Sequence, residues 1–126
     1  MFTEEAEQWY RGLGAEQKRV VTAAVDRLEI KGPALARPFA DTIKRSRYHH
    51  MKELRPRPGN LRALFAFDAQ RRGVVLIGGD KTNNWKGWYQ PNIDRADRLY
   101  AQHLRQAGKE LPWRARDGAR SVTRSL

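Results

Sequence analysis

The chain has 126 residues and a mass of 14.6 kDa, which predicts one compact domain. Hydrophobic residues make up 40% of it, and no apolar run approaches the roughly 18 residues that span a bilayer. We therefore expect a folded cytoplasmic protein with no membrane partner. The sequence contains no cysteine, which excludes disulfide scaffolds, cysteine-based zinc sites and cysteine nucleophiles.

The net charge of +11 is concentrated in the middle of the sequence. Residues 1–43 carry 6 basic and 7 acidic side chains, whereas residues 44–89 carry 11 and 3. A cationic surface attracts polyanions, because each phosphate that it neutralises releases counterions. The middle of the chain therefore predicts a polyanionic partner, with a merely solvated basic surface as the alternative.

Two helices are expected in the first third of the chain. Thr3 is a suitable N-cap for a helix whose apolar residues recur at helical spacing until Gly12 and Gly14 stop the pattern. A second apolar stripe over residues 20–28 ends before the Gly-Pro pair at residues 32–33. We expect these segments to form an antiparallel helical hairpin.

Three strands are expected next, after an ambiguous segment at residues 34–46. Residues 50–55 form a short strand candidate, residues 61–68 alternate between two faces, and residues 74–77 form an apolar run typical of a central strand. The connections are short, so the three strands predict an antiparallel meander. The glycines at residues 78–79 are expected to let the backbone leave the sheet.

A loop rich in aromatic and basic residues then leads to a third helix, for which Asn92 is the expected cap. Its apolar side chains share one face until Leu104. The tail over residues 105–126 holds 6 basic and 2 acidic side chains and few apolar anchors. The sequence therefore predicts an α+β domain over residues 1–104, followed by a flexible basic tail.

The sequence contains no motif for a metal, a phosphate-binding loop or a nucleophile elbow. Neighbouring residues of a strand point to opposite faces, so His49 and His50 are unsuited to hold one ion together. We expect neither a metal nor another cofactor. The remaining candidate site is a cluster of basic and aromatic side chains on the sheet and the loop that follows it. It comprises Lys52, Arg55, Arg62, Lys81, Trp85, Lys86, Trp88 and Tyr89.

These residue types provide what metal-free RNA cleavage requires. Arg and Lys bind phosphates and stabilise the extra charge of a pentacovalent transition state. Tyr or His can act on the attacking 2′-hydroxyl or the leaving 5′-oxygen, and Trp can stack on unpaired bases. The alternative interpretation is that one or both tryptophans pack against the third helix while the charges are solvated.

Three short segments carry a resemblance to a known family. Residues 51–55 read MKELR, residues 61–68 read LRALFAFD and residues 76–82 read LIGGDKT. In this order, behind a helical hairpin, they resemble a HigB-type toxin of the RelE/ParE toxin-antitoxin superfamily. The resemblance implies a helical hairpin on a small twisted antiparallel sheet with a further helix after it. It also implies cleavage of mRNA on the ribosome and inhibition by a cognate antitoxin protein.

The resemblance implies roles for individual residues. Arg62 matches the arginine that contacts the scissile phosphate, and Lys81 matches a second basic catalytic residue. Tyr89 lies near an aromatic residue implicated in proton transfer or stacking. His50 is the fourth catalytic candidate, because some branches use histidines from this neighbourhood as acid or base. The expected RNA-binding residues are Lys52, Arg55, Trp85, Lys86 and His49.

One departure from the family concerns the start of the chain. Members usually begin with a strand before the first helix, whereas this chain enters its helix at Thr3. Either the start codon is assigned too late, or the sheet lacks an edge strand and leaves its neighbour unpaired. Two other functions stay open, a ParE-like inhibitor of DNA gyrase and a non-catalytic homologue that binds antitoxin or nucleic acid. The polar and aromatic residues of the cluster favour the endoribonuclease.

Overall fold

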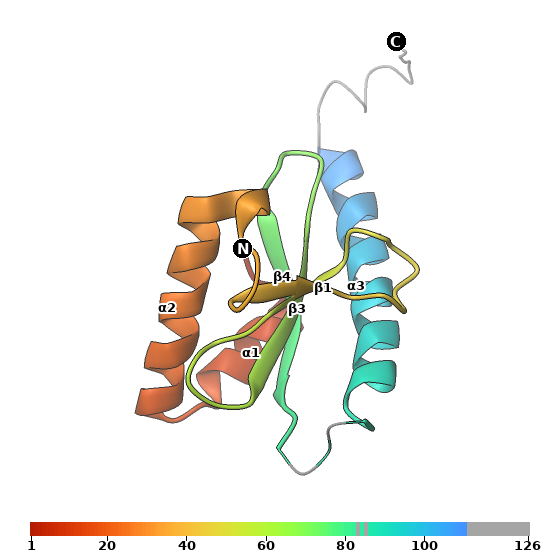
Figure 1. The fold of residues 1–126 in the computed structure, drawn as a ribbon. Helices are drawn as coiled ribbons and strands as arrows, with labels where there is room; N and C mark the ends of the chain where they lie inside the picture. Colours follow the sequence, from red (N-terminus) through yellow and green to blue (C-terminus); the bar gives the residue numbers. More distant parts are fainter. Residues whose placement is uncertain (83, 85, 111–126) are drawn as a thin grey trace.

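A four-stranded antiparallel sheet with the order β1-β2-β3-β4 forms the middle layer of the protein (Figure 1). The computed structural model describes residues 1–82, 84 and 86–110. The strands are β1 (Ala40–Thr42), β2 (Lys52–Leu54), β3 (Leu61–Phe67) and β4 (Gly73–Asp80), and the helices are α1 (Glu4–Arg11), α2 (Ala15–Lys31) and α3 (Tyr89–Glu110), with a 3-10 turn at Gly32–Ala34. The predicted α+β class is confirmed. None of the helices in the described ranges is long and apolar enough to cross a membrane.

The two N-terminal helices begin and end where the sequence predicts. The Thr3 hydroxyl accepts a hydrogen bond from the Ala6 N–H (3.1 Å) and donates one to the Leu76 carbonyl (2.7 Å), so the cap of α1 also ties the helix to β4. α2 ends at Gly32, whose φ of 57° lies in the left-handed region that favours glycine. Both helices pack on the same face of the sheet, and the predicted helical hairpin is confirmed (Figure 1).

The predicted antiparallel meander is confirmed as β2, β3 and β4, but the sheet has a fourth strand, because the ambiguous segment contains the edge strand β1. It pairs with β2 in the register Ala40↔Leu54 and Thr42↔Lys52. A three-residue strand is too short to show an alternating pattern, and Pro38 lies two residues before it, so sequence periodicity gives no signal for it.

The two faces of the sheet bury different side chains, as the alternation over residues 61–68 predicts. Ala63 and Phe65 pack with the helical hairpin, whereas Leu64 and Ala66 pack with α3. A β-bulge between β3 and β4 falls at Leu64/Phe65. Arg62, two residues before Leu64 on β3, therefore belongs to the face that α3 covers.

The glycine pair at residues 78–79 stays inside β4, and the expectation that it lets the backbone leave the sheet is wrong. A side chain on Gly78 would overlap the indole ring of Trp9, and one on Gly79 would overlap that of Trp88. The two tryptophans approach from opposite faces, Trp9 from α1 and Trp88 from the position directly before α3. Glycine is needed at both positions because each indole packs directly on the strand backbone.

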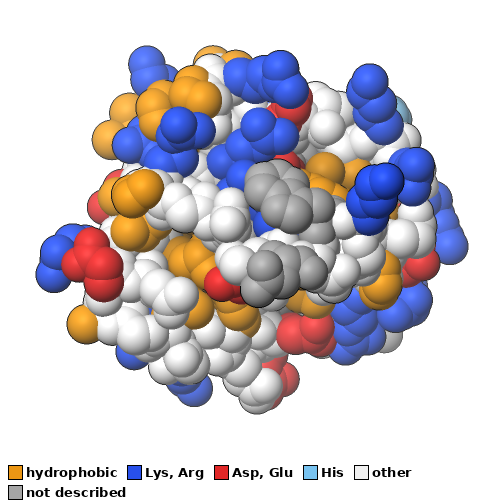
Figure 2. Space-filling model, turned by 60° about the horizontal axis from the view of Figure 1, so that its bottom comes forward, with side chains coloured by type: hydrophobic (Ala, Val, Ile, Leu, Met, Phe, Trp, Pro, Cys, Tyr) orange, Lys and Arg blue, Asp and Glu red, His pale blue; other side chains and the backbone are white. Residues whose placement is uncertain are grey.

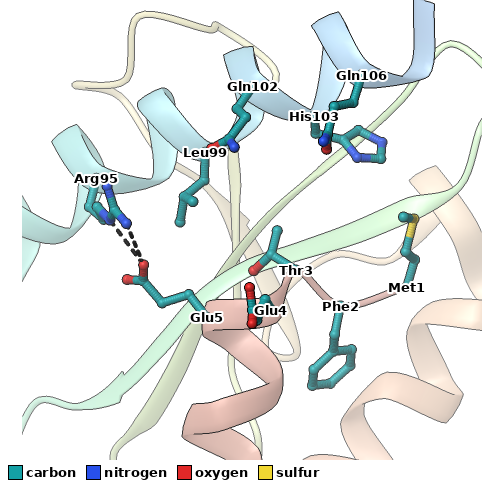
Figure 3. A pocket seen from close by; sticks show the side chains of 10 residues that line it. All are labelled: Met1, Phe2, Thr3, Glu4, Glu5, Arg95, Leu99, Gln102, His103 and Gln106. Carbon is teal, nitrogen blue, oxygen red and sulfur yellow. Dashed lines mark hydrogen bonds and ion pairs between the residues drawn. The ribbon is translucent and has the colours of Figure 1, made fainter. Parts of the chain in front are cut away.

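The first three residues cover part of the β4 edge, which the sequence leaves unpaired. The Thr3 N–H donates to the Val75 carbonyl (3.0 Å), and the Val75 N–H donates to the Met1 carbonyl (2.8 Å), in a parallel bridge. A hollow of about 460 Å³ separates this segment from α3, and across it Arg95 forms an ion pair with Glu5 (2.7 Å; Figure 3). The expectation of an exposed edge is therefore wrong for this part of β4.

α3 is longer at both ends than the sequence predicts. It begins at Tyr89, and Asn92 lies within its first turn, where its side-chain amide donates to the Trp88 carbonyl (2.5 Å). It continues to Glu110, so the predicted end at Leu104 is wrong. The rest of the predicted tail, residues 111–126, lies outside the described residues, and the domain boundary at residue 104 stays a prediction.

Candidate active site

Six ionisable side chains meet at one end of the sheet, on the face that α3 covers. They come from all four strands or the residues next to them, and from α3. Because Asp41 pairs with Glu53, and Glu53 pairs with Leu64, their side chains lie on the face that also carries Arg62. Arg55 follows β2 on the same face, Lys81 follows β4 and Tyr89 opens α3. We refer to Asp41, Glu53, Arg55, Arg62, Lys81 and Tyr89 as the Arg62 cluster.

Three charged members of the cluster are almost completely buried. Glu53 is 1% exposed, Lys81 4% and Arg62 9%. Burying a charge is costly unless it is paired and hydrogen-bonded, so charges retained at such positions frequently serve a function.

Glu53 is the negative centre of the cluster. Its Oε1 accepts a hydrogen bond from Nε of Arg55 (2.8 Å) and lies 3.9 Å from Nε of Arg62. Arg55 also contacts the carboxylate of Asp41 (3.4 Å). Although burial opposes it, the hydrogen bond to Glu53 raises the pKa of Arg55, and the guanidinium stays fixed beside the carboxylate.

Arg62 is held by the backbone more than by the carboxylate. Its Nη1 donates to the carbonyls of Leu61 (2.7 Å) and Gly59 (3.3 Å). Within the part of the chain that the structure describes, Nε of Arg62 and Oε2 of Glu53 are buried without a hydrogen-bond partner. Such an unsatisfied donor is costly in a folded protein, and an anion would satisfy it.

Lys81 and Tyr89 form a hydrogen-bonded pair. Nζ of Lys81 donates to the phenolic oxygen of Tyr89 over 3.0 Å. Burial and the nearby Arg62 lower the pKa of Lys81, whereas burial and the nearby carboxylate of Glu53 raise the pKa of Tyr89 to about 12. Tyr89 therefore keeps its proton at neutral pH and can donate it.

An open groove of about 590 Å³ adjoins the cluster at Tyr89. Its walls include Lys44 and Arg45, from the basic segment after β1, and Lys86, from the loop before α3. Figure 2 shows the end of the molecule where β4 leads into α3, and Lys and Arg side chains are frequent on it. A groove with cationic walls that ends at a proton donor suits a nucleic-acid strand.

Four of the predicted site residues come together, and a fifth lies nearby. Arg55, Arg62, Lys81 and Tyr89 are members of the cluster, and Lys86 lines the adjoining groove. Sequence reasoning missed Glu53 and Asp41 because buried and exposed carboxylates look alike in a sequence. The one available signal was that Glu53 and Arg55 alternate on the same face of a strand.

Three other predicted residues lie elsewhere. Lys52 points to the opposite face of β2 and donates to the Pro33 carbonyl (3.3 Å). Nε2 of His50 lies 2.9 Å from the Tyr100 hydroxyl, which donates to the carbonyl of Phe67 at the far end of β3 from Arg62. His49 is exposed beside His50, with ring centroids 5.2 Å apart. The roles predicted for these residues stay predictions that the geometry does not favour.

Of the two tryptophans predicted in the loop before the third helix, the structure describes Trp88. Trp88 is buried over Gly79 and packs edge-on against Tyr89, with ring centroids 5.1 Å apart, so the interpretation as a packing residue holds for it. Trp85, predicted to stack on RNA, lies outside the described residues. Among the described residues, no three His, Asp or Glu side chains are grouped so that they could hold a metal ion.

Comparisons with known proteins agree with this fold. The family model described as Phage derived protein Gp49-like (DUF891) matches residues 8–101. The toxin HigB3 of Mycobacterium tuberculosis is 47% identical over 93 residues, which are 74% of this chain and 82% of HigB3. The toxin HigB2 of the same organism is 41% identical over 114 residues, which are 88% of this chain and 57% of HigB2. This chain therefore spans somewhat more than half of HigB2.

The solved structure of the RelB-RelE antitoxin-toxin complex from Methanococcus jannaschii shares the fold. A chain of that complex superposes with a TM-score of 0.50 at 9% identity, over 70% of this chain and 98% of that chain. Fold and relatives together define the class, a toxin of a toxin-antitoxin system. The chain belongs to the Gp49-like (DUF891) family and to the HigB-type toxins, so the predicted HigB-type family is confirmed, and the superposition on the RelE complex shows a shared fold.

Proposed function

We propose that the protein is an endoribonuclease that cleaves mRNA on the ribosome, with the Arg62 cluster as its active site. The buried donor of Arg62 that has no hydrogen-bond partner among the described residues is the observation that carries this proposal. Arg62 lies beside two other cationic side chains, Arg55 and Lys81, and the phenol of Tyr89 is at their edge. This is the arrangement that binding and cleaving a phosphodiester requires.

Each side chain has a distinct role in this reaction. The 2′-oxygen of the RNA attacks the phosphorus and loses its proton to solvent, while the bond from phosphorus to the 5′-oxygen breaks. Arg62 and Lys81 stabilise the charge that builds on the phosphate oxygens, and Arg55 adds to the positive potential. Tyr89 gives its proton to the departing 5′-oxygen, and Lys81 stabilises the phenolate through their hydrogen bond.

The partners follow from the same proposal. The groove walls at Lys44, Arg45 and Lys86 bind the phosphates that flank the cleaved one, in mRNA held by the ribosome in the cytoplasm. A cognate antitoxin is the inhibitory partner, which the RelB-RelE complex supports by likeness of fold.

The test is cleavage of a defined mRNA on purified ribosomes. The wild-type protein should cut within translated codons, and Arg62→Ala should slow cleavage by about 10²-fold or more. Arg19→Ala is the matched control, because Arg19 is an exposed α2 residue paired only with the exposed Glu16 within the described residues. Inhibition of gyrase supercoiling by a protein that leaves the mRNA intact would overturn the proposal in favour of a ParE-like function.

A further inference from the structure

Glu53 occupies an unusual position for a carboxylate. It is 1% exposed, and charged or phenolic groups face it from every neighbouring element. These groups are Asp41 from β1, Arg55 beside it on the β2 side, Arg62 from β3, Lys81 after β4 and Tyr89 from α3. Without Glu53, three cations would share one buried site with the half-buried Asp41 as the single other acid of the cluster.

The carboxylate of Glu53 contacts Arg55 and Arg62 in different ways. It binds Arg55 through a 2.8 Å hydrogen bond, whereas Arg62 lies 3.9 Å away and is attracted by charge alone. Among the described residues, Nε of Arg62 therefore stays without a hydrogen-bond partner although a carboxylate is next to it. Glu53 thus attracts Arg62, which backbone carbonyls also hold, without using the donor that a phosphate would need.

We propose that Glu53 is the positioning residue of the Arg62 cluster: its buried carboxylate holds the cationic side chains together before RNA binds and leaves the Arg62 donor for the scissile phosphate. This inference rests on the proposed nuclease function. When the phosphate arrives, it supplies the negative charge that Glu53 provides in the free protein. Glu53 does not touch the reacting atoms, and it acts through Arg62, Lys81 and Tyr89.

The same carboxylate keeps Tyr89 in its protonated form. Burial and the charge of Glu53 together raise the pKa of Tyr89 to about 12, and the positive charge of Arg62 opposes them. Removing the charge of Glu53 while keeping its shape should therefore ease the loss of the Tyr89 proton. A purely structural carboxylate, needed only for folding, would give no such coupling between Glu53 and the reaction.

The decisive variant is Glu53→Gln, which keeps the oxygen that accepts from Arg55 and removes the charge. In the isolated protein, the ¹³Cζ resonance of Tyr89, assigned with Tyr89→Phe, should titrate at lower pH than in the wild type. Ribosomes programmed with an mRNA that carries a 2′-deoxynucleotide at the cut should bind the variant at least as tightly as the wild type. Single-turnover cleavage of the ordinary mRNA should fall by about 10²-fold, because displaced catalytic groups cost that much.

A second variant keeps the test valid if Glu53→Gln fails to fold. Glu53→Asp retains the charge but withdraws it by one methylene from Arg62, so binding should be kept and cleavage should lie between wild type and Glu53→Gln. Glu16→Gln makes the same chemical change at an exposed carboxylate of α2 that pairs with Arg19, so it should leave cleavage near the wild-type rate and serves as control. Two results would overturn the inference. One is that both Glu53 variants cleave mRNA at the wild-type rate and show the wild-type titration of Tyr89, and the other is a changed Tyr89 titration with unchanged cleavage.

A wild-type protein that never cuts mRNA would instead overturn the proposed function. In that case the Tyr89 titration still reports on Glu53.

Discussion

Lys81 and Tyr89, at the two ends of the connection from β4 to α3, are joined by a 3.0 Å hydrogen bond from the ammonium to the phenolic oxygen. Lys81 is 4% exposed, so this pair lies under the surface beside Arg62 rather than in bulk solvent. A cation that already touches the proton donor stabilises the phenolate as the donor loses its proton. In the proposed reaction, this partly buried pair would therefore link phosphate binding to proton transfer.

Tyr89→Phe should separate proton transfer from binding. Phenylalanine keeps the edge-on packing against Trp88 and removes the oxygen that Lys81 contacts. Cleavage on ribosomes should fall by about 10² to 10⁴-fold, while affinity for the ribosome-mRNA complex is unchanged. Tyr10→Phe, at an exposed hydrogen bond between α1 and α2, is the matched control. Cleavage by Tyr89→Phe at the wild-type rate would show that Tyr89 does not supply the proton in the reaction.

Lys44 and Arg45 should contribute electrostatically to RNA binding. Replacing both by alanine removes two cationic walls of the groove. The slope of log affinity against log salt for a single-stranded RNA should then become shallower by about one to two units. Arg19→Ala combined with Lys31→Ala removes the same charge from exposed positions on α2 and should leave the slope unchanged. Equal salt slopes in the two double variants would show that the RNA does not bind in the groove lined by Lys44 and Arg45.

Gly79→Ala should damage both stability and activity. The added methyl group would come within 2.5 Å of the Trp88 indole nitrogen, and Tyr89 follows Trp88 directly. Overpacking of this kind costs about 1–3 kcal/mol of unfolding free energy, measurable by urea denaturation. Gly12→Ala, whose methyl group would lie 3.6 Å from its nearest neighbour, should cost less. Combining Gly79→Ala with Trp88→Phe should recover part of the loss, and the absence of any recovery would contradict the predicted clash.

Asp68 should make stability depend on pH. It accepts hydrogen bonds from the backbone N–H of Gln70 (2.9 Å) and Arg72 (3.0 Å), and its Oδ2 lies 3.1 Å from Nε2 of His103. Burial alone would raise the pKa of Asp68, but the hydrogen bonds from Arg72 and His103 outweigh it and hold the pKa below its ordinary 3.8. The folded state thus binds the proton more weakly than the unfolded state, so this stabilisation is present above about pH 4 and is lost as the pH falls through the folded pKa.

Urea unfolding of Asp68→Asn measures this contribution. The variant should be less stable than the wild type by about 1–3 kcal/mol at neutral pH, and the difference should shrink as the pH falls below about 4. Asp26→Asn, at an exposed position on α2, is the control and should match the wild type throughout. A difference that does not depend on pH would show that the charge of Asp68 is not what stabilises the fold.

Local signals in the sequence were sufficient for most of the fold. The Thr3 cap and two apolar stripes predict α1 and α2, and strict alternation from Arg62 to Phe67 predicts both faces of β3. The features of the fold that the sequence analysis missed depend on contacts between segments that are distant in the sequence. β1 exists because it pairs with β2, and the Gly78-Gly79 pair is explained by indoles that approach from Trp9 and Trp88. Periodicity in a short window contains no information about such partners.

The candidate site was predicted where strand alternation fixes side-chain direction. Arg55 and Arg62 were predicted as strand residues of the cluster, Lys81 and Tyr89 as residues of the loop that follows, and the structure brings these four side chains together. Their roles in the reaction stay predictions. Lys52 lies outside the cluster because it is one residue away from Glu53 on β2 and therefore points to the other face, and its RNA-binding role stays a prediction. Glu53 was missed because its burial arises from the tertiary packing of α3 over the sheet, which a single sequence does not display.

The most direct test of the central claim is primer extension on cellular mRNA after induction of the wild-type protein, Arg62→Ala and Arg19→Ala, with growth recorded in parallel. We predict discrete cuts within translated codons and growth arrest for the wild type and Arg19→Ala, and the loss of both for Arg62→Ala. Growth arrest without cuts, or cuts that persist unchanged in Arg62→Ala, would contradict the assignment of the Arg62 cluster as a ribosome-dependent nuclease site.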